Sequence, residues 1–179
     1  QKTNQIFTPR RIVKMVVDAL EDENPRIFNN KDATFADLYV KSGLFLTEIV
    51  TRLFEGLSEE IPDKKLRLKH IMENQIFGYA PSEIIYNIAK NFIYGGYKDF
   101  DNSHLVCCDL TELAKSGGSL GMKFDVVVGN PPYQESGSGG NNQDPSLYNY
   151  FYDLSKGIAP KYCLITPARF LSKQGSINK

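Results

Sequence analysis

The sequence predicts an α/β fold in which a doubly wound, mostly parallel sheet is covered by helices on both faces. Five short apolar runs predict strands, and the segments between them show the helical spacing of apolar residues. Several runs are continuously apolar, which is typical of parallel strands buried on both faces. With 179 residues and 41% hydrophobic content, the chain can bury one sizeable core, so we expect a single domain over residues 1–179.

Helices and strands alternate from the start of the chain. Thr8 and Pro9 predict a helix start, because a hydroxyl can cap free amides and proline is tolerated in the first turn. The apolar stripe of this helix is Val13, Val16, Val17 and Leu20. Residues 34–38 predict the first strand, and a turn with Ser42 and Gly43 leads into the next helix. The stripe of that helix is Leu46, Ile49, Val50, Leu53 and Leu57.

The alternation continues through the rest of the chain. Residues 75–79 predict the second strand, and Pro81 is expected to open a helix. The buried side of that helix is expected to be Ile85, Ile88, Ala89 and Phe92. Further strands are predicted at residues 104–108, 124–129 and 161–166. In such sheets a ligand lies beyond the carboxyl ends of the strands. The residues at four of these ends are Asp37, Tyr79, Asp109 and Asn130, which we expect to lie near a pocket.

Two segments between the predicted strands differ in composition from the rest. Residues 134–146 contain three glycines, two asparagines and three serines, which predicts a mobile loop beside the site; the alternative is a linker without a role. Lys64, Lys65, Arg67 and Lys69 form a basic run that we interpret as a solvated helix face, with contact to phosphate as the alternative.

The whole-chain composition excludes several classes of protein. Basic and acidic residues both number 21, so there is no general basic excess of the kind that many nucleic-acid binders have. The three cysteines show neither a disulfide framework nor a zinc spacing, so we expect no metal site and a reducing cytoplasm. No apolar stretch approaches the roughly 20 residues that span a bilayer, so we expect no membrane partner.

The tetrapeptide Asn130-Pro131-Pro132-Tyr133 directly follows an apolar run and indicates a reaction centre. An amine on a heteroaromatic ring is a poor nucleophile, because its lone pair is delocalised into the ring. Acceptors on both N–H groups, here the Asn130 side-chain oxygen and the Pro131 carbonyl, would free that lone pair. Pro132 restricts the orientation of the Pro131 carbonyl, and the Tyr133 ring could stack against an extruded base. The alternative is that the two prolines only end the strand.

Residues 130–133 resemble the catalytic motif of the adenine-N6 DNA methyltransferases. Residues 7–9 resemble the motif of that family that contacts the methionine part of S-adenosylmethionine, and residues 37–46 resemble its cofactor loop. The resemblance spans residues 4–171 and implies a Rossmann-like fold of the S-adenosylmethionine-dependent methyltransferase type. Because that fold has seven strands and five are visible here, we expect the sheet to be incomplete at the carboxyl end, with the target-recognition domain absent.

The resemblance also implies the residues that bind S-adenosylmethionine. They are Phe7, Thr8, Pro9, Asp37, Ser42, Gly43, Phe45 and Asp109, the last of which corresponds to the acid that meets the amine of the cofactor adenine. From the residues alone, Asp109 could instead cap the following helix, Phe7 could be a core aromatic, and the turn at Gly43 could be an ordinary strand-to-helix turn.

This sequence departs from the family pattern at two places. In the cofactor loop Leu38, Val40 and Lys41 stand where the family usually has proline, cysteine and glycine. After the second strand, where the family has an acid that holds the ribose, residues 79–81 contain none, and Glu83 is the nearest substitute. Even so, S-adenosylmethionine has no pyrophosphate that would require a loop with three glycines.

The predicted activity is therefore methylation of the adenine N6 amine in DNA that the intact protein binds, with a fused or associated endonuclease as a possible partner. A protein-glutamine methyltransferase presents the same tetrapeptide to a similar planar amine, but such enzymes have a helical recognition domain before the cofactor strand, and here only 36 residues precede Asp37. Two further hypotheses are an RNA amino-methyltransferase and a non-catalytic specificity or binding subunit.

Overall fold

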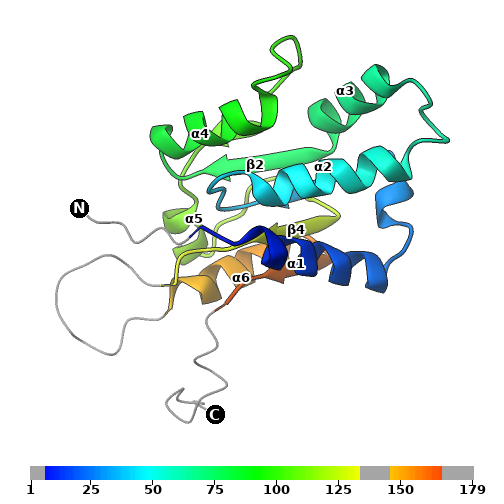
Figure 1. The fold of residues 1–179 in the computed structure, drawn as a ribbon. Helices are drawn as coiled ribbons and strands as arrows, with labels where there is room; N and C mark the ends of the chain where they lie inside the picture. Colours follow the sequence, from blue (N-terminus) through cyan, green and yellow to red (C-terminus); the bar gives the residue numbers. More distant parts are fainter. Residues whose placement is uncertain (1–6, 134–145, 167–179) are drawn as a thin grey trace.

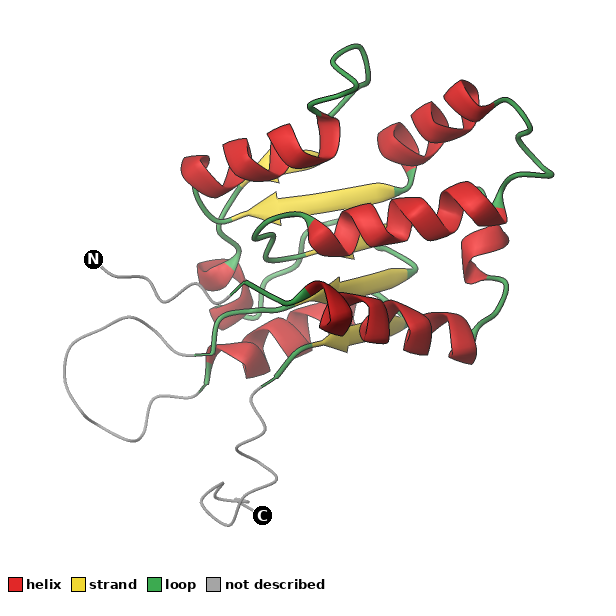
Figure 2. Ribbon diagram, viewed as in Figure 1, coloured by secondary structure: helices red, strands yellow, loops and turns green. Residues whose placement is uncertain are grey.

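The computed structural model describes residues 7–133 and 146–166, which form one five-stranded sheet with helices on both faces (Figures 1 and 2). The strands are β1 (Phe35–Asp37), β2 (Ile76–Ala80), β3 (Leu105–Cys107), β4 (Val126–Gly129) and β5 (Lys161–Leu164). All neighbours are parallel, in the order β3-β2-β1-β4-β5. The predicted fold class is confirmed, and the strand ends differ from the predicted runs by one or two residues.

Apolar clusters on the two faces of the sheet form the core. The helices of one face are α1 (Arg10–Glu23), α2 (Leu44–Gly56), α3 (Lys64–Asn74) and α4 (Glu83–Tyr94), with the short 3-10 helix η1 (Ile27–Asn29). Those of the other face are α5 (Thr111–Lys115) and α6 (Leu147–Ile158). Phe35 packs into the first cluster and Ala36 into the second, because successive strand residues point to opposite faces. Continuously apolar runs thus reflect burial on both sides.

The position of the site follows from the junction between β1 and β4 at the centre of the sheet. The chain leaves β1 for α2 on one face and leaves β4 for α6 on the other. Connections that separate in this way leave a crevice beyond the carboxyl ends of the strands. Asp37 pairs in register with Val128, so Asn130 follows directly beyond the same edge.

Helices α1 and α2 bury the predicted stripes. Val13, Val17 and Leu20 of α1 are buried, and Val16 is half-buried against them. The predicted cap is wrong, however, because the helix begins at Arg10 after Pro9 with no side-chain cap. The Thr8 hydroxyl instead accepts a hydrogen bond from Asn130, as described below.

Helix α4 differs from the prediction in its start and in its buried face. It begins at Glu83, not at Pro81, because the Ser82 hydroxyl accepts a hydrogen bond from the Ile85 amide and caps it. The buried positions are Ile85, Ala89, Ile93 and Tyr94, whereas Ile88 and Phe92 are 44% and 53% exposed. The helix has apolar residues on two sides. The side that packs on the sheet contains two of the four predicted residues, Ile85 and Ala89.

Arg67 of α3 is a further correction, because the basic run is not a uniformly solvated face. Its side chain is buried and its guanidinium lies 4.1 Å from the centroid of the Phe54 ring. Lys64 and Lys65 are exposed, as predicted. The burial of Arg67 is consistent with a guanidinium packing on an aromatic face.

The predicted loop at residues 134–146 lies outside the described residues except for Ser146. Ser146 is the residue before α6. Within residues 7–133 and 146–166, no helix combines the length and apolar character needed to cross a membrane.

A single arginine links α1 to α2, and its removal is predicted to destabilise the fold. Arg52 Nη1 donates to Glu21 and Nη2 to Asp18, each at 2.5 Å, and Nε donates to Glu48 at 3.2 Å. Arg52→Met keeps the apolar stem and leaves the buried carboxylate of Glu48 without this partner, so the free energy of unfolding in urea should fall by about 1–3 kcal/mol. Arg26→Met, at an exposed arginine, is the matched control; an equal loss there would contradict the assignment.

Candidate active site

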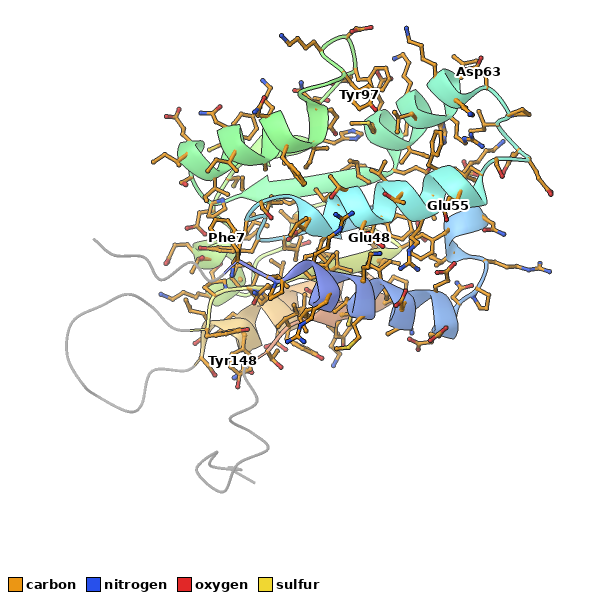
Figure 3. The ribbon with its side chains drawn as sticks, in the orientation of Figure 1. Phe7, Glu48, Glu55, Asp63, Tyr97 and Tyr148 are labelled. Atoms are coloured by element: carbon orange, nitrogen blue, oxygen red, sulfur yellow. The ribbon has the colours of Figure 1, made fainter. Side chains whose placement is uncertain are left out.

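A small pocket at the carboxyl edge of the sheet contains six of the residues predicted from the sequence. It joins the end of β1, the turn before α2 and the residue after β4, and Figure 3 shows Phe7 on the same side of the molecule. Its free volume is about 10 Å³, room for one water molecule. The residues that line it are Thr8, Asp37, Tyr39, Lys41, Ser42, Gly43, Leu44, Phe45 and Asn130.

Asn130 is held so that its two amide atoms have different surroundings. Its side chain is 6% exposed, and Nδ2 donates a hydrogen bond of 2.9 Å to Thr8 Oγ1. The amide oxygen Oδ1 is buried and has no hydrogen-bond partner among the described residues. Leaving a buried acceptor unpaired costs roughly 1–3 kcal/mol. Such an atom at the edge of a pocket is a site for a donor from a ligand.

Asp37 is a buried carboxylic acid beside Asn130. Burial raises the pKa of Asp37 to about 7, while its hydrogen bond from the Tyr39 amide, at 3.0 Å, and the charge of Lys41 act in the opposite direction. The close approach depends on Gly129, where a Cβ would lie 2.9 Å from Asp37 Oδ1. The carboxyl group therefore changes charge near neutral pH, in the pocket that Asn130 also lines.

Gly43 forms the turn between Ser42 and α2, and only glycine suits its position. Its φ is +93°, in the left-handed region that side chains disfavour. A Cβ at this position would lie 2.9 Å from Cδ1 of Ile93 in α4. The missing side chain at Gly43 thus leaves room for α4, and Gly43 also lines the pocket.

Sequence reasoning did not select Tyr39 as a site residue, and it treated Lys41 only as a departure from the family pattern. Burial lowers the pKa of Lys41, and the charge of Asp37 counteracts this. Burial raises the pKa of Tyr39, and the carboxylate of Asp109 adds to the increase. The position of both residues between a strand end and Gly43 was the available signal, since that loop must border any ligand at this edge.

The other predicted residues lie outside this pocket. Pro131 is buried, Pro132 and Tyr133 are half-buried, and burial raises the pKa of Tyr133. Phe7 is 52% exposed, which excludes the alternative of a core aromatic. Pro9 is exposed, and the Tyr79 hydroxyl donates to Met122 Sδ at 3.7 Å.

Asp109 is exposed and ends β3 with a local turn. Its Oδ1 accepts hydrogen bonds from the Thr111 amide at 2.9 Å and the Thr111 hydroxyl at 2.6 Å, just before α5. The bonds form a local turn and not the helix cap given as the alternative, because the N-cap of α5 is Leu110, without a side-chain cap. Its charge nevertheless adds to the raised pKa of Tyr39, which lines the pocket.

A larger hollow has no connection with the predicted site. It has a volume of about 610 Å³, and its lining consists of Glu60 and most of the residues between 24 and 32. These residues precede β1 or follow α2, so they lie at the amino edge of the sheet. Since none of the predicted residues lines it, volume alone does not identify the site.

Comparison with known proteins relates the chain to a family of restriction-modification methylases. The sequence profile of the Eco57I restriction-modification methylase family matches residues 74–179. A curated protein from Mycoplasma pneumoniae, described as an uncharacterized adenine-specific methylase, is 23% identical over 236 aligned residues, which include 94% of this chain and 56% of the relative. The chain therefore spans little more than half the length of that relative.

Solved structures with the same fold include two DNA complexes. The DrdV–DNA complex has a TM-score of 0.71 and 15% identity, with 96% of this chain and 21% of that one covered. The ATP-dependent Type ISP restriction-modification enzyme LlaBIII bound to DNA also has a TM-score of 0.71 and 15% identity, with 97% and 16% covered. At this identity the similarity establishes the fold.

Substitution of Gly43 should disturb the turn at the pocket. Gly43→Ala adds a side chain in a left-handed conformation and against Ile93, so its thermal midpoint should fall most in a series of three variants. Gly117→Ala tests backbone strain alone, because φ is +67° and no atom lies within 4 Å of the added Cβ. Gly96→Ala tests neither effect, because its φ is not in the left-handed region and the space around it is open. Calorimetry should rank the losses as Gly43 above Gly117 above Gly96; equal losses at Gly43 and Gly117 would show that Ile93 yields without cost.

Asp37 should make stability depend on pH. Because its pKa is raised from 3.8 to about 7, the native state binds more protons than the unfolded state between these values. The free energy of unfolding should therefore decrease as pH rises from about 4 to about 7, by a few kcal/mol at most. Asp37→Asn should flatten this slope in urea titrations, whereas Asp153→Asn, at an exposed carboxyl, should keep it. An unchanged slope in Asp37→Asn would refute the assignment.

Proposed function

Because the chain belongs to the Eco57I restriction-modification methylase family, we propose that it methylates the N6 amine of adenine in DNA with S-adenosylmethionine as methyl donor. The observation that carries this proposal is the buried, unpartnered Oδ1 of Asn130 at the edge of the pocket. It supplies one of the two acceptors that an aromatic amine needs for attack. The name of the Mycoplasma pneumoniae relative favours adenine as the base.

The residues of the chain position the amine and free its lone pair. Asn130 Oδ1 accepts one N–H of the adenine amine, while Nδ2 stays bonded to Thr8 and prevents the amide from rotating. The Pro131 carbonyl accepts the second N–H, because Pro132 restricts Pro131 to an extended conformation. The ring of Tyr133 stacks on the extruded base, worth about 1–3 kcal/mol. The methylated amine then releases its proton to solvent, so no general base is needed before attack.

The residues around the pocket fit S-adenosylmethionine in their chemistry. When bound, this cofactor supplies the methyl group of its sulfonium centre. The rest of the cofactor is then the leaving group, a neutral thioether. Asp37 can balance the charge of its methionine ammonium, and Ser42, Gly43 and Phe45 border the same space. Because the free volume beside Gly43 is about 10 Å³, the adenosine part would extend past Tyr39 towards Asp109. Phe7, Thr8 and Pro9 would cover the methionine part.

Two observations favour a second candidate, a methyltransferase-like subunit that does not bind the cofactor. Lys41 lines the pocket where the family usually has glycine, and the strand end at residues 79–81 has no acid for a ribose. A calorimetric titration with S-adenosylmethionine separates the candidates. Heat with a one-to-one endpoint supports the enzyme, and the absence of heat supports the subunit.

We further propose that residues 1–179 act as one catalytic domain of a longer assembly. The chain covers 56% of the Mycoplasma relative and 21% and 16% of the DNA-bound restriction-modification structures. Target recognition, and a nuclease if one accompanies the methyltransferase, would then reside in other segments or subunits.

The decisive test follows the label from S-adenosylmethionine carrying a tritiated methyl group. After incubation with duplex DNA, digestion to nucleosides should place the label on N6-methyladenine, as identified by mass spectrometry. Label on a protein glutamine amide, or on RNA supplied in the same reaction, would instead support a protein or RNA substrate.

Asn130→Ala should reduce the methylation rate by about 10²–10³-fold, the typical effect of removing one hydrogen-bonding group from a reaction centre. Its affinity for S-adenosylmethionine should change little, because Oδ1 is assigned to the target amine. Asn74→Ala, at an exposed asparagine of α3, is the matched control and should keep the wild-type rate. Full activity of Asn130→Ala would refute the proposed mechanism.

A further inference from the structure

The first two turns of α1 form a basic cluster, which we define as Arg10, Arg11 and Lys14. All three side chains are exposed, and none forms an ion pair within the part of the chain that the structure describes. The second half of the same helix is acidic, with Asp18, Glu21, Asp22 and Glu23. The chain as a whole is neutral, so the cluster is a local excess of positive charge.

Helix stability does not explain the basic cluster. The amino end of a helix has a partial positive charge, so cations there are unfavourable. Helix α1 has no acidic residue in its first turn and no side-chain cap. Helix α3 also begins with two lysines, but there the Asp63 carboxylate accepts a hydrogen bond of 2.8 Å from the Leu66 amide and places a negative charge at the helix end. In α1 the positive charge is uncompensated.

The basic cluster lies beside the proposed reaction centre. Thr8 is hydrogen-bonded to Asn130. Arg10 follows Thr8 by two residues, so the Cα atoms of Thr8 and Arg10 are at most about 7.6 Å apart. Lys14 is about 6 Å further along the helix axis. Figure 3 shows Phe7 at the side towards which the strands point, and Asp63 at the opposite side.

From this placement we propose that the basic cluster binds the phosphates of duplex DNA next to the adenine that is presented to Asn130. The inference rests on the proposed function and adds to it the surface that holds the nucleic-acid backbone. Duplex DNA has one negative charge per roughly 1.7 Å of its axis, so three cations spread over one and a half turns of helix can meet neighbouring phosphates. Such contacts set the position of the duplex and do not read its sequence.

Arginine suits this role, because its guanidinium can bind a phosphate through two parallel hydrogen bonds. The acidic second half of α1 would repel the DNA backbone, so only the amino-terminal end of the helix favours contact with DNA. A duplex held at Arg10, Arg11 and Lys14 remains close to the edge of the sheet where the pocket lies.

The test compares the salt dependence of DNA binding between the wild-type protein and Arg10→Ala/Arg11→Ala/Lys14→Ala. Affinity for a fluorescein-labelled duplex is measured by anisotropy between 50 and 200 mM salt. Three lost phosphate contacts should reduce the slope of log K against log salt by about 2.7, so wild-type affinity should fall about 40-fold more than that of the variant over this range. Lys64→Ala/Lys65→Ala, which removes exposed charges at the opposite edge, should keep the wild-type slope.

Several outcomes separate this inference from the proposed function. Circular dichroism should show the triple variant folded and at least as stable as the wild type, because alanine is a good helix former and the opposed charges are gone. Equal slopes for wild type and triple variant, or an equal change in the lysine control, would overturn the inference while leaving methylation at Asn130 intact. Tighter binding of an RNA duplex with the same change in slope would overturn the assignment to DNA. Absence of heat on titration with S-adenosylmethionine would count against the proposed function alone.

Discussion

The hydrogen bond from Asn130 Nδ2 to Thr8 Oγ1 is the constraint on which the site depends. It joins two segments that are 122 residues apart in the chain and holds the start of α1 against the end of β4. This bond uses one N–H of the amide, while the amide oxygen is buried and costly to leave unpaired. The bond therefore fixes which of the two amide atoms of Asn130 is left as an unpaired acceptor. An aromatic amine is the kind of group that such an acceptor selects.

The surrounding structure maintains this arrangement through packing on one face of the sheet. Helix α1 is positioned by its buried valines and by the contacts of Arg52 with Asp18 and Glu21. Helix α4 packs against Gly43 through Ile93, so the turn before α2 and the pocket share a wall. Because the buried valines of α1 and Ile93 of α4 belong to the same apolar cluster, the geometry of the pocket is coupled to the stability of the fold.

Charge is distributed locally in a chain that has no net charge. Within the pocket, burial brings the pKa of Asp37 to about 7 and lowers that of Lys41, and the opposite charge of each residue partly offsets the effect of burial on the other. On the surface, the two halves of α1 have opposite signs. A protein that binds a polyanion through a small area needs only such a local excess, and whole-chain composition does not reveal it.

The sequence by itself determined the elements whose cause is local. Short apolar runs predicted the five strands of the described residues, helical spacing predicted the buried stripes of α1 and α2, and Asn130-Pro131-Pro132-Tyr133 marked the end of a strand. These features follow from residue periodicity and from the steric restrictions of proline and glycine, which act over a few residues.

Tertiary structure alone decided the features that depend on contacts between distant segments. It placed β4 beside β1, buried Ile93 and Tyr94 of α4 in place of Ile88 and Phe92, and assigned the Thr8 hydroxyl to Asn130 in place of a helix cap. Each of these is a choice between arrangements that are locally equivalent. A helix with two apolar stripes, or a hydroxyl with two available donors, has no local preference, so the arrangement that buries the most apolar surface and pairs the most polar groups decides.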